Sequence, residues 1–186
     1  MGYAVAQAAV QAGHTAVLVA GPTQLPDPIG IKTLHVTSTQ QMRDAVLSRL
    51  DGADIVVGAA APCDFRPAEC QTHKVKKKAG QLVLTLIPTP DALAEAGQRK
   101  GRRVLIGFAM EVRNGRRNAL DKLTKKNLDA IVLNAPKAFA GETTSATILK
   151  RDGTEEDWRH VEKADLARRL VALAEELWET QCAPTR

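Results

Sequence analysis

Short apolar runs alternate with longer stretches of mixed polarity along this chain. The apolar runs are typical of buried strands and cover residues 15–20, 31–36, 54–60, 103–109 and 128–133. The mixed stretches have helical spacing and cover residues 2–13, 37–50, a segment opened by Pro90 and Asp91, 118–126 and 164–180. This alternation predicts a parallel sheet with helices on both faces.

Local signals refine this pattern. Gly13 is placed to end the first helix, and Ser38 and Gln41 have the spacing of a capping box. Residues 21–30 and 61–70 are predicted loops, and residues 81–87 are a predicted exposed edge strand. Two strand-like pieces, 147–150 and 155–160, flank an Asp-Gly pair and predict a hairpin. Three features are interpreted as structural: His35, the Trp158/Trp178 pair and the leucine stripe of the last helix, Leu166, Leu170, Leu173 and Leu177.

The chain opens on a helix, whereas a doubly wound sheet normally opens on a strand whose glycine-rich turn leads into that helix. We therefore expect an α/β fold of the Rossmann-like, three-layer, doubly wound kind, with a mostly parallel sheet lacking its first strand and a small antiparallel extension. A slot is expected beside residues 15–20 or 54–59. Residues 1–180 are expected to form a single domain, and residues 181–186 a C-terminal tail.

Composition narrows the class of protein. With 44% hydrophobic residues, the 186-residue chain has enough apolar side chains for a core, which excludes a disordered chain. The three cysteines form no C-x-x-C pair, which indicates reduced thiols and a cytoplasmic protein. No apolar run reaches the ~20 residues of a membrane span. A net charge of +5 is compatible with nucleotides or nucleic acid, but the basic residues are dispersed and aromatic residues make up only 3%, so a nucleic-acid partner is not expected.

The sharpest candidate site is a turn of small residues after the third predicted strand. Gly58, Ala59, Ala60 and Ala61 precede Asp64, and a lysine run begins at Lys74. Open α/β sheets bind ligands beyond the carboxyl ends of their strands, where small residues let a base or ribose approach and lysines can close over phosphates. A solvated turn followed by a solvated basic loop is the alternative.

Two further groups lie near predicted strand ends. Lys122 and Lys126 are four residues apart and share one helix face, so they can meet one anion, although an ordinary polar helix surface has the same spacing. Phe108 can pack on a planar base or belong to the core.

Several of these motifs occur together and in order. They are Met1-Gly2-Tyr3-Ala4, Asp64-Phe-Arg66, Lys74-Val-Lys76-Lys77, Pro90-Asp91, Gly107-Phe108-Ala109 with Glu111, Lys125-Lys126-Asn127-Leu128-Asp129, and Asn134. As a set they resemble phosphopantothenoylcysteine synthetase, the CTP-dependent ligase that forms the C-terminal part of a bifunctional bacterial protein of coenzyme A biosynthesis. The chain departs from the family pattern at Pro62-Cys63, Met110 and Val112.

The resemblance implies a two-step ligation. The carboxylate of 4′-phosphopantothenate attacks the α-phosphate of CTP with Mg²⁺ present, which gives an acyl-cytidylate and pyrophosphate. The amine of L-cysteine then displaces CMP and forms the amide. The family also implies a homodimer, with residues 70–88 as flap and dimerisation strand, and a phosphopantothenoylcysteine decarboxylase partner or domain whose FMN binds outside this chain.

The resemblance also assigns roles to residues. Gly58, Ala59, Ala60, Ala61 and Asp64 are expected to hold the cytidine, and Lys74 is expected to act as the catalytic residue on the flap. The nucleotide pocket is expected to be lined by Phe108 and by Pro90, Asp91, Ala92 and Leu93. Lys122 and Lys126 are expected to contact the phosphates. No metal-ligating residue is assigned.

Two alternatives remain open. Family members carry a strand and phosphate-binding loops before the Met-Gly pair at which this chain begins, so an inactive nucleotide-binding remnant is one alternative, and weak or absent ligation by the 186-residue chain is the expectation. A Rossmann-like NAD(P)-binding oxidoreductase is the other, but no G-x-G-x-x-G follows a predicted strand.

Overall fold

The computed structural model describes residues 1–77, 80–111, 113–134 and 143–182. In these residues the helices and strands follow one another as α1 (Gly2–Gln11), β1 (Val17–Ala20), β2 (Lys32–His35), α2 (Thr39–Leu47), the 3₁₀ helix η1 (Leu50–Gly52), β3 (Ile55–Gly58), β4 (Phe65–Pro67), β5 (Leu86–Pro88), α3 (Ala92–Gln98), β6 (Val104–Met110), α4 (Gly115–Lys125), β7 (Ala130–Asn134), β8 (Thr143–Lys150), β9 (Glu155–Glu162) and α5 (Lys163–Cys182). The predicted elements are therefore present, with shifts of a few residues at their ends.

The larger sheet has five strands in the order β3-β6-β7-β8-β9. The pairs β3–β6 and β6–β7 are parallel, while β8 and β9 add an antiparallel hairpin at one side. The predicted Asp-Gly hairpin is confirmed and is longer than expected, because both of its strands extend by several residues. Parallel pairing brings the carboxyl ends of β3, β6 and β7 to the same edge of this sheet, called here the carboxyl edge.

Helices cover the larger sheet on both faces, as predicted. Along β6, Val104 and Ile106 point into a core made with α1 and α5. Leu105 and Ala109 point to the other face, into a core made with α3 and α4. All four residues are buried, so β6 lies at the centre of a three-layer α/β fold.

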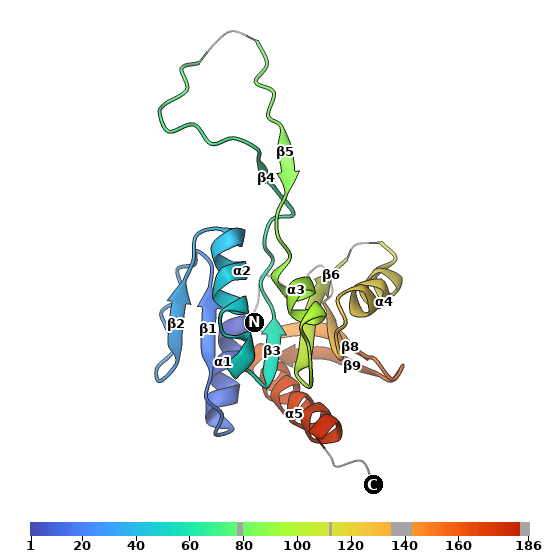
Figure 1. The fold of residues 1–186 in the computed structure, drawn as a ribbon. Helices are drawn as coiled ribbons and strands as arrows, with labels where there is room; N and C mark the ends of the chain where they lie inside the picture. The colour runs from blue at the N-terminus through green and yellow to red at the C-terminus, as the bar shows by residue number, and fades with distance from the viewer. Residues whose placement is uncertain (78–79, 112, 135–142, 183–186) are drawn as a thin grey trace.

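The parallel arrangement is interrupted between β1 and β3. In the described part of the chain β1 pairs only with β2, in a separate two-stranded parallel sheet, and β3 pairs only with β6. Figure 1 shows β1 and β2 at the left of the molecule, next to the β3 side of the larger sheet, with α1 close to β1. The predicted interruption of the sheet next to the first helix is confirmed.

Capping interactions define two of the helices. Ser38 Oγ accepts a hydrogen bond from the Gln41 backbone N–H at 3.1 Å, which is the predicted N-cap of α2. The Gln41 side chain reaches back to the Thr37 N–H at 2.8 Å instead of to the N-cap residue itself. Gly13 follows α1 with a positive φ of 93°, as expected for a glycine that ends a helix.

A long arm leaves the sheet between β3 and α3 (Figure 1). At its base β4 pairs antiparallel with β5. Two predictions are wrong here: residues 61–70 contain strand β4, and the expected strand over residues 81–87 is reduced to β5, Leu86–Pro88. A strand needs partners for its backbone groups, and in the described chain residues 86–88 have them on β4, while beyond this pairing the Thr85 carbonyl accepts a hydrogen bond from the Ala68 N–H at 2.9 Å.

Candidate functional site at the carboxyl edge

Several predicted site residues lie at the carboxyl edge. Gly58 is the last residue of β3 and is paired with Gly107 of β6, so Phe108 stands beside the turn that carries Ala59, Ala60 and Ala61. Asp64 follows at the base of the arm, where its backbone carbonyl accepts a hydrogen bond from the Thr89 N–H at 2.9 Å. The parallel register thus gathers segments that are far apart in the sequence.

The start of α3 packs directly on the two paired glycines. An ideal Cβ on Gly58 would lie 2.8 Å from Leu93 Cδ2, and one on Gly107 would lie 3.3 Å from the same atom. Gly58 therefore provides space for a side chain of the protein itself, whereas the sequence had been interpreted as leaving that space for a ligand. Leu93 is accordingly a packing residue on the face covered by α3 and α4.

Asp91 caps α3 and binds one of the candidate lysines. Its Oδ1 accepts the Ala94 N–H at 3.0 Å, and its Oδ2 lies 2.7 Å from Lys126 Nζ. Burial acts to raise the pKa of Asp91, but the hydrogen bonds from Lys126 and Ala94 outweigh it, and the pKa lies below its ordinary value. Asp91 is therefore anionic at neutral pH and holds Lys126 at the N-terminal end of α3.

The close approach of α3 and α4 allows this reach. A Cβ on Gly97 would lie only 2.0 Å from the backbone oxygen of Lys126, so the two helix ends touch at a position that only glycine can occupy. Asn127, with a positive φ of 53°, donates from Nδ2 to the Gly97 carbonyl at 3.0 Å. The Lys126 side chain extends from this contact to Asp91.

The second candidate lysine is held by a carboxylate that sequence analysis did not select. Lys122 Nζ lies 2.6 Å from Glu111 Oε1, and Asn118 Nδ2 donates to Glu111 Oε2 at 3.0 Å. The hydrogen bonds from Lys122 and then Asn118 lower the pKa of Glu111 below its ordinary value. In the sequence analysis Glu111 appeared only as a member of the motif that contains Phe108. Its position at the end of a predicted strand was the signal that could have identified it as a site residue.

Phe108 faces the other side of the sheet. Its side chain packs against the core formed by α1 and α5, whereas Leu93 packs against the core formed with α3 and α4. A ligand that contacts both Phe108 and the lysines must therefore lie across the carboxyl edge. The predicted pocket residues do not share one face.

The arm carries Lys74, the predicted catalytic residue. Lys74, Lys76 and Lys77 are exposed, and Lys78, the last residue of the predicted lysine run, lies outside the described residues. The arm also exposes large apolar side chains, with exposed fractions of 54% to 84%: Phe65, Val75, Leu82, Val83, Leu84 and Leu86. Such a cluster is unusual for a surface that contacts only water.

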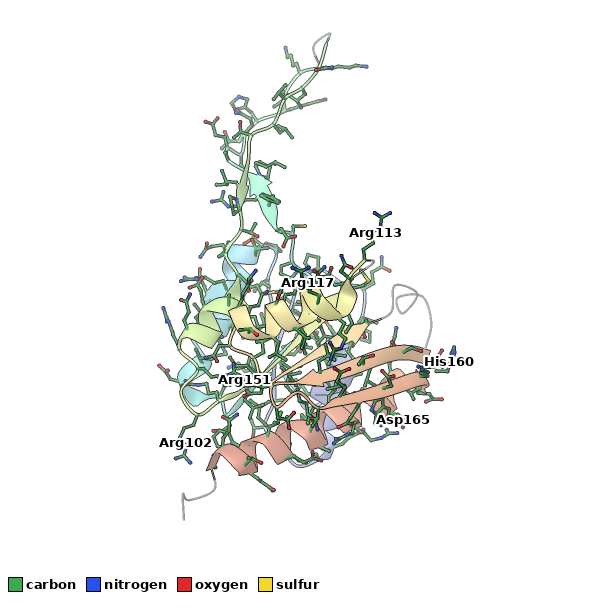
Figure 2. The ribbon with its side chains drawn as sticks, turned by 90° about the vertical axis from the view of Figure 1, so that its right-hand side faces the viewer. Arg102, Arg113, Arg117, Arg151, His160 and Asp165 are labelled. Atoms are coloured by element: carbon green, nitrogen blue, oxygen red, sulfur yellow. The ribbon has the colours of Figure 1, made fainter. Side chains whose placement is uncertain are left out.

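The opposite edge of the sheet differs in character. A cavity of about 260 Å³ there is lined by His14, Asp54, Ile55, Glu175, Trp178 and Glu179, none of which was a predicted site residue. Figure 2 shows Arg102 near the end of α5, at the end of the molecule away from the arm, and Arg113 projecting outward at the start of α4.

The described residues contain neither a metal-binding cluster nor a membrane-spanning helix. Outside residues 78–79, 112, 135–142 and 183–186, no three His, Cys, Asp or Glu side chains are grouped so that they could hold a metal ion. No helix in the same part of the chain is both long enough and apolar enough to cross a membrane.

The fold and this edge define a Rossmann-like α/β domain with two lysine–carboxylate pairs at the carboxyl edge of its sheet. The chain belongs to the family described as "DNA/pantothenate metabolism flavoprotein C-terminal domain", whose model matches residues 1–177. The resemblance to phosphopantothenoylcysteine synthetase is thereby confirmed at the level of the family.

Named relatives agree with this assignment. The coenzyme A biosynthesis bifunctional protein CoaBC of Bacillus subtilis is 41% identical over 172 residues, which cover 90% of this chain and 42% of that protein. CoaBC of Mycobacterium tuberculosis is 38% identical over 185 residues, which cover 91% of this chain and 44% of that protein. The chain thus spans less than half the length of these relatives.

A solved structure of the C-terminal domain of CoaBC superposes with a TM-score of 0.83 at 32% identity, and the match covers 96% of this chain and 82% of that one. This agreement confirms the predicted fold class.

Proposed function

We propose that this chain carries the ligase site that joins 4′-phosphopantothenate to L-cysteine through an acyl-cytidylate. The observation that carries the proposal is the pair of lysines, Lys122 and Lys126, held by Glu111 and Asp91 at the carboxyl edge. Membership of the CoaBC family supports the ligation, and the lysine pairs offer positive charge for the phosphates of a nucleoside triphosphate at this edge.

In the first step a carboxylate oxygen of 4′-phosphopantothenate attacks the α-phosphorus of CTP, and the bond to the β-phosphate oxygen breaks. In the second step the cysteine amine attacks the acyl carbon, loses a proton and releases CMP. Neither step needs a nucleophilic side chain of the protein. Both need fixed positive charge near the phosphates, which Lys122 and Lys126 supply from α4 and Lys74 supplies from the arm.

Mg²⁺ fits this site as a companion of the phosphates. Magnesium is commonly held by substrate phosphates and water with few protein ligands. The nearest carboxylates, Asp91 and Glu111, are already bound to lysines. When bound, the ion would offset charge on the phosphates, while Asp91 and Glu111 hold the lysines in place.

The arm supports a homodimer as part of the proposal. Leu82, Val83 and Leu84 expose 76%, 84% and 60% of their surface, and residues 81–84 have no strand partner within the described chain. A second copy can supply both an apolar surface and an edge for pairing. A monomeric mass in native solution would contradict this part of the proposal.

The experiment is cysteine-dependent release of CMP from CTP by the purified chain, alone and as part of a longer protein that includes a decarboxylase domain with its FMN. ATP in place of CTP tests the nucleotide. Lys74→Gln should lower kcat by at least roughly tenfold, as removal of a charge-stabilising group does. Lys32→Gln, an exposed lysine on β2, is the matched control and should leave the rate unchanged. Hydrolysis of CTP that does not depend on cysteine would refute the proposal.

A further inference from the structure

Glu111 occupies an unusual place at the carboxyl edge. It directly follows β6, and both of its carboxylate oxygens are engaged by α4: Oε1 by Lys122 Nζ at 2.6 Å and Oε2 by Asn118 Nδ2 at 3.0 Å. Asn118 and Lys122 are one helical turn apart, so they project from the same face of α4 toward the end of β6. A Cβ on Gly115 would lie 3.4 Å from Glu111 Cβ, which shows how closely α4 begins against this residue.

Exposure differs between the two partners of this ion pair. The Glu111 side chain is 18% exposed and that of Lys122 is 42% exposed, so the carboxylate lies on the inner side and the ammonium on the outer side. Among the described residues the Lys122 ammonium donates only to Glu111. An ammonium has three N–H bonds, so two remain for an anion at the edge.

The second lysine also meets a carboxylate that has another donor, but the exposures are reversed, with 27% for the Lys126 side chain and 46% for Asp91. Lys126 binds Asp91 Oδ2, while Asp91 Oδ1 is held by the backbone of Ala94. In both pairs the carboxylate accepts from a second donor, Asn118 for Glu111 and the Ala94 N–H for Asp91. A fixed carboxylate restricts a lysine that would otherwise sample many rotamers, and ordering such a side chain in advance lowers the entropic cost of binding.

We infer that Glu111, held by Asn118, is a positioning residue that fixes the Lys122 ammonium for contact with the β- and γ-phosphates of a nucleoside triphosphate. The inference rests on the proposed function, because it takes the carboxyl edge as the nucleotide site. Glu111 acts through Lys122 and does not itself touch the nucleotide. Because the negative charge of Glu111 repels phosphate, Glu111 can strengthen nucleotide binding only when Lys122 is present.

A double-mutant cycle separates these two effects. The equilibrium dissociation constants of CTP and CMP are measured by calorimetry, in the presence of Mg²⁺, for the full chain and for Glu111→Gln, Lys122→Gln and the double variant. Glu111→Gln keeps the shape of the side chain and removes its charge. It should weaken CTP binding by roughly tenfold, since one charge-assisted interaction loses its geometry, and should change CMP binding by less than about twofold. In the Lys122→Gln background the same change should weaken CTP binding no further.

Glu155→Gln is the matched control. Glu155 pairs with Arg116, also from α4, on a part of the surface that includes β9. Its variant should bind CTP within about twofold of the unsubstituted chain, because this surface ion pair involves neither Glu111 nor Lys122 and such pairs contribute little. Thermal unfolding of every variant separates a binding effect from a loss of folded protein.

Three results would overturn the inference. Glu111→Gln could bind CTP as tightly as the unsubstituted chain or more tightly, it could weaken CMP and CTP equally, or its effect could persist unchanged when Lys122 is already Gln. The first outcome would mean that repulsion dominates, and the other two that the pair is a structural contact.

Inorganic tripolyphosphate, used as a second probe in the same cycle, distinguishes failure of this inference from failure of the proposed function. If Glu111 and Lys122 are coupled in tripolyphosphate binding, but CTP binds no more tightly than tripolyphosphate, the cytidine site is refuted and the positioning role stands. Normal CTP binding without coupling would refute only the positioning role. Absence of binding by both probes would refute both.

Discussion

Lysine–carboxylate pairs occupy both edges of the larger sheet, and they differ in burial. At the edge opposite the arm, the side chains of Lys100 and Asp129 are 10% and 7% exposed. Asp129 accepts three hydrogen bonds there, from Lys100, from the Leu105 N–H at 2.7 Å and from Gln181 at 2.9 Å. This carboxylate joins β6, β7 and α5, and its acceptor positions are used within the protein.

At the carboxyl edge the lysines are more accessible. Lys122 and Lys126 are 42% and 27% exposed, and each meets one carboxylate. Removing a buried carboxylate that several donors share leaves those donors unpaired, whereas a more exposed lysine with N–H bonds to spare can bind an anion. The same two residue types therefore serve structure at one edge and are available for chemistry at the other.

Asp129→Ala should give the largest effect and tests the structural side of this comparison. It leaves the Lys100 ammonium and the Leu105 N–H buried without their partner, which should lower the free energy of unfolding by about 3–5 kcal/mol. Urea denaturation measures the change. Asp51→Ala, whose side chain is fully exposed beside Arg103, is the matched control and should cost less than ~1 kcal/mol. Equal losses in the two variants would contradict the distinction between the edges.

Gly97→Ala tests the contact that brings Lys126 to the carboxyl edge. Because the added Cβ would meet the Lys126 carbonyl, α3 and α4 must separate, at a cost of roughly 1–3 kcal/mol of unfolding free energy. The same shift should move Lys126 away from Asp91 and weaken CTP binding. Gly52→Ala, where the added Cβ meets nothing within 4 Å, is the control in both assays. A Gly97→Ala protein as stable as that control would show that the helices adjust without strain.

Lys126→Gln tests the functional side of the comparison. Its unfolding free energy should change by less than ~1 kcal/mol, because the pair with Asp91 is partly solvated. CTP binding should weaken by roughly tenfold with the loss of one phosphate contact. Lys100→Gln is the counterpart at the other edge, with reduced stability and unchanged CTP affinity at temperatures where it stays folded. If Lys126→Gln lowered stability without changing CTP affinity, and Lys100→Gln lowered CTP affinity without changing stability, the roles assigned to the two edges would be wrong.

The pH dependence of stability gives the smallest expected effect. The pKa of Glu111 is lowered from its ordinary value of 4.5 by the hydrogen bonds from Lys122 and Asn118. A lowered pKa in the folded state contributes stability that is fully present above pH 4.5 and is lost as the pH falls through the folded-state pKa. Glu111→Gln should therefore be less stable than the unsubstituted chain at pH 7, and the two should converge in acid. A constant difference from pH 7 to acid would contradict this.

Much of the fold could be predicted from local sequence patterns. The apolar run 103–109 predicted a core strand, and it forms β6 at the centre of the sheet, because alternate residues of that run bury their side chains on opposite faces. Ser38 predicted the start of α2 through its side-chain oxygen. The arm was less predictable, since whether residues 81–87 form a strand depends on a partner that lies elsewhere.

The candidate site shows the same division. Spacing alone placed Lys122 and Lys126 on one face of a helix, and motif order placed Phe108 and Asp91 at strand and helix ends. Their present partners could not be obtained in this way. Glu111 lies 11 residues from Lys122 in the sequence, and Asp91 lies 35 residues from Lys126.

The sequence by itself determined the helices, the strands outside the arm, the family and the residue types gathered at the carboxyl edge, because periodicity, caps and motifs are local properties of a chain. Only the tertiary structure decided which lysine meets which carboxylate, that Leu93 fills the space above Gly58, and that Phe108 faces away from the lysines. Those outcomes depend on how α3 and α4 cross the sheet, and that crossing is set by packing between segments that no local pattern connects.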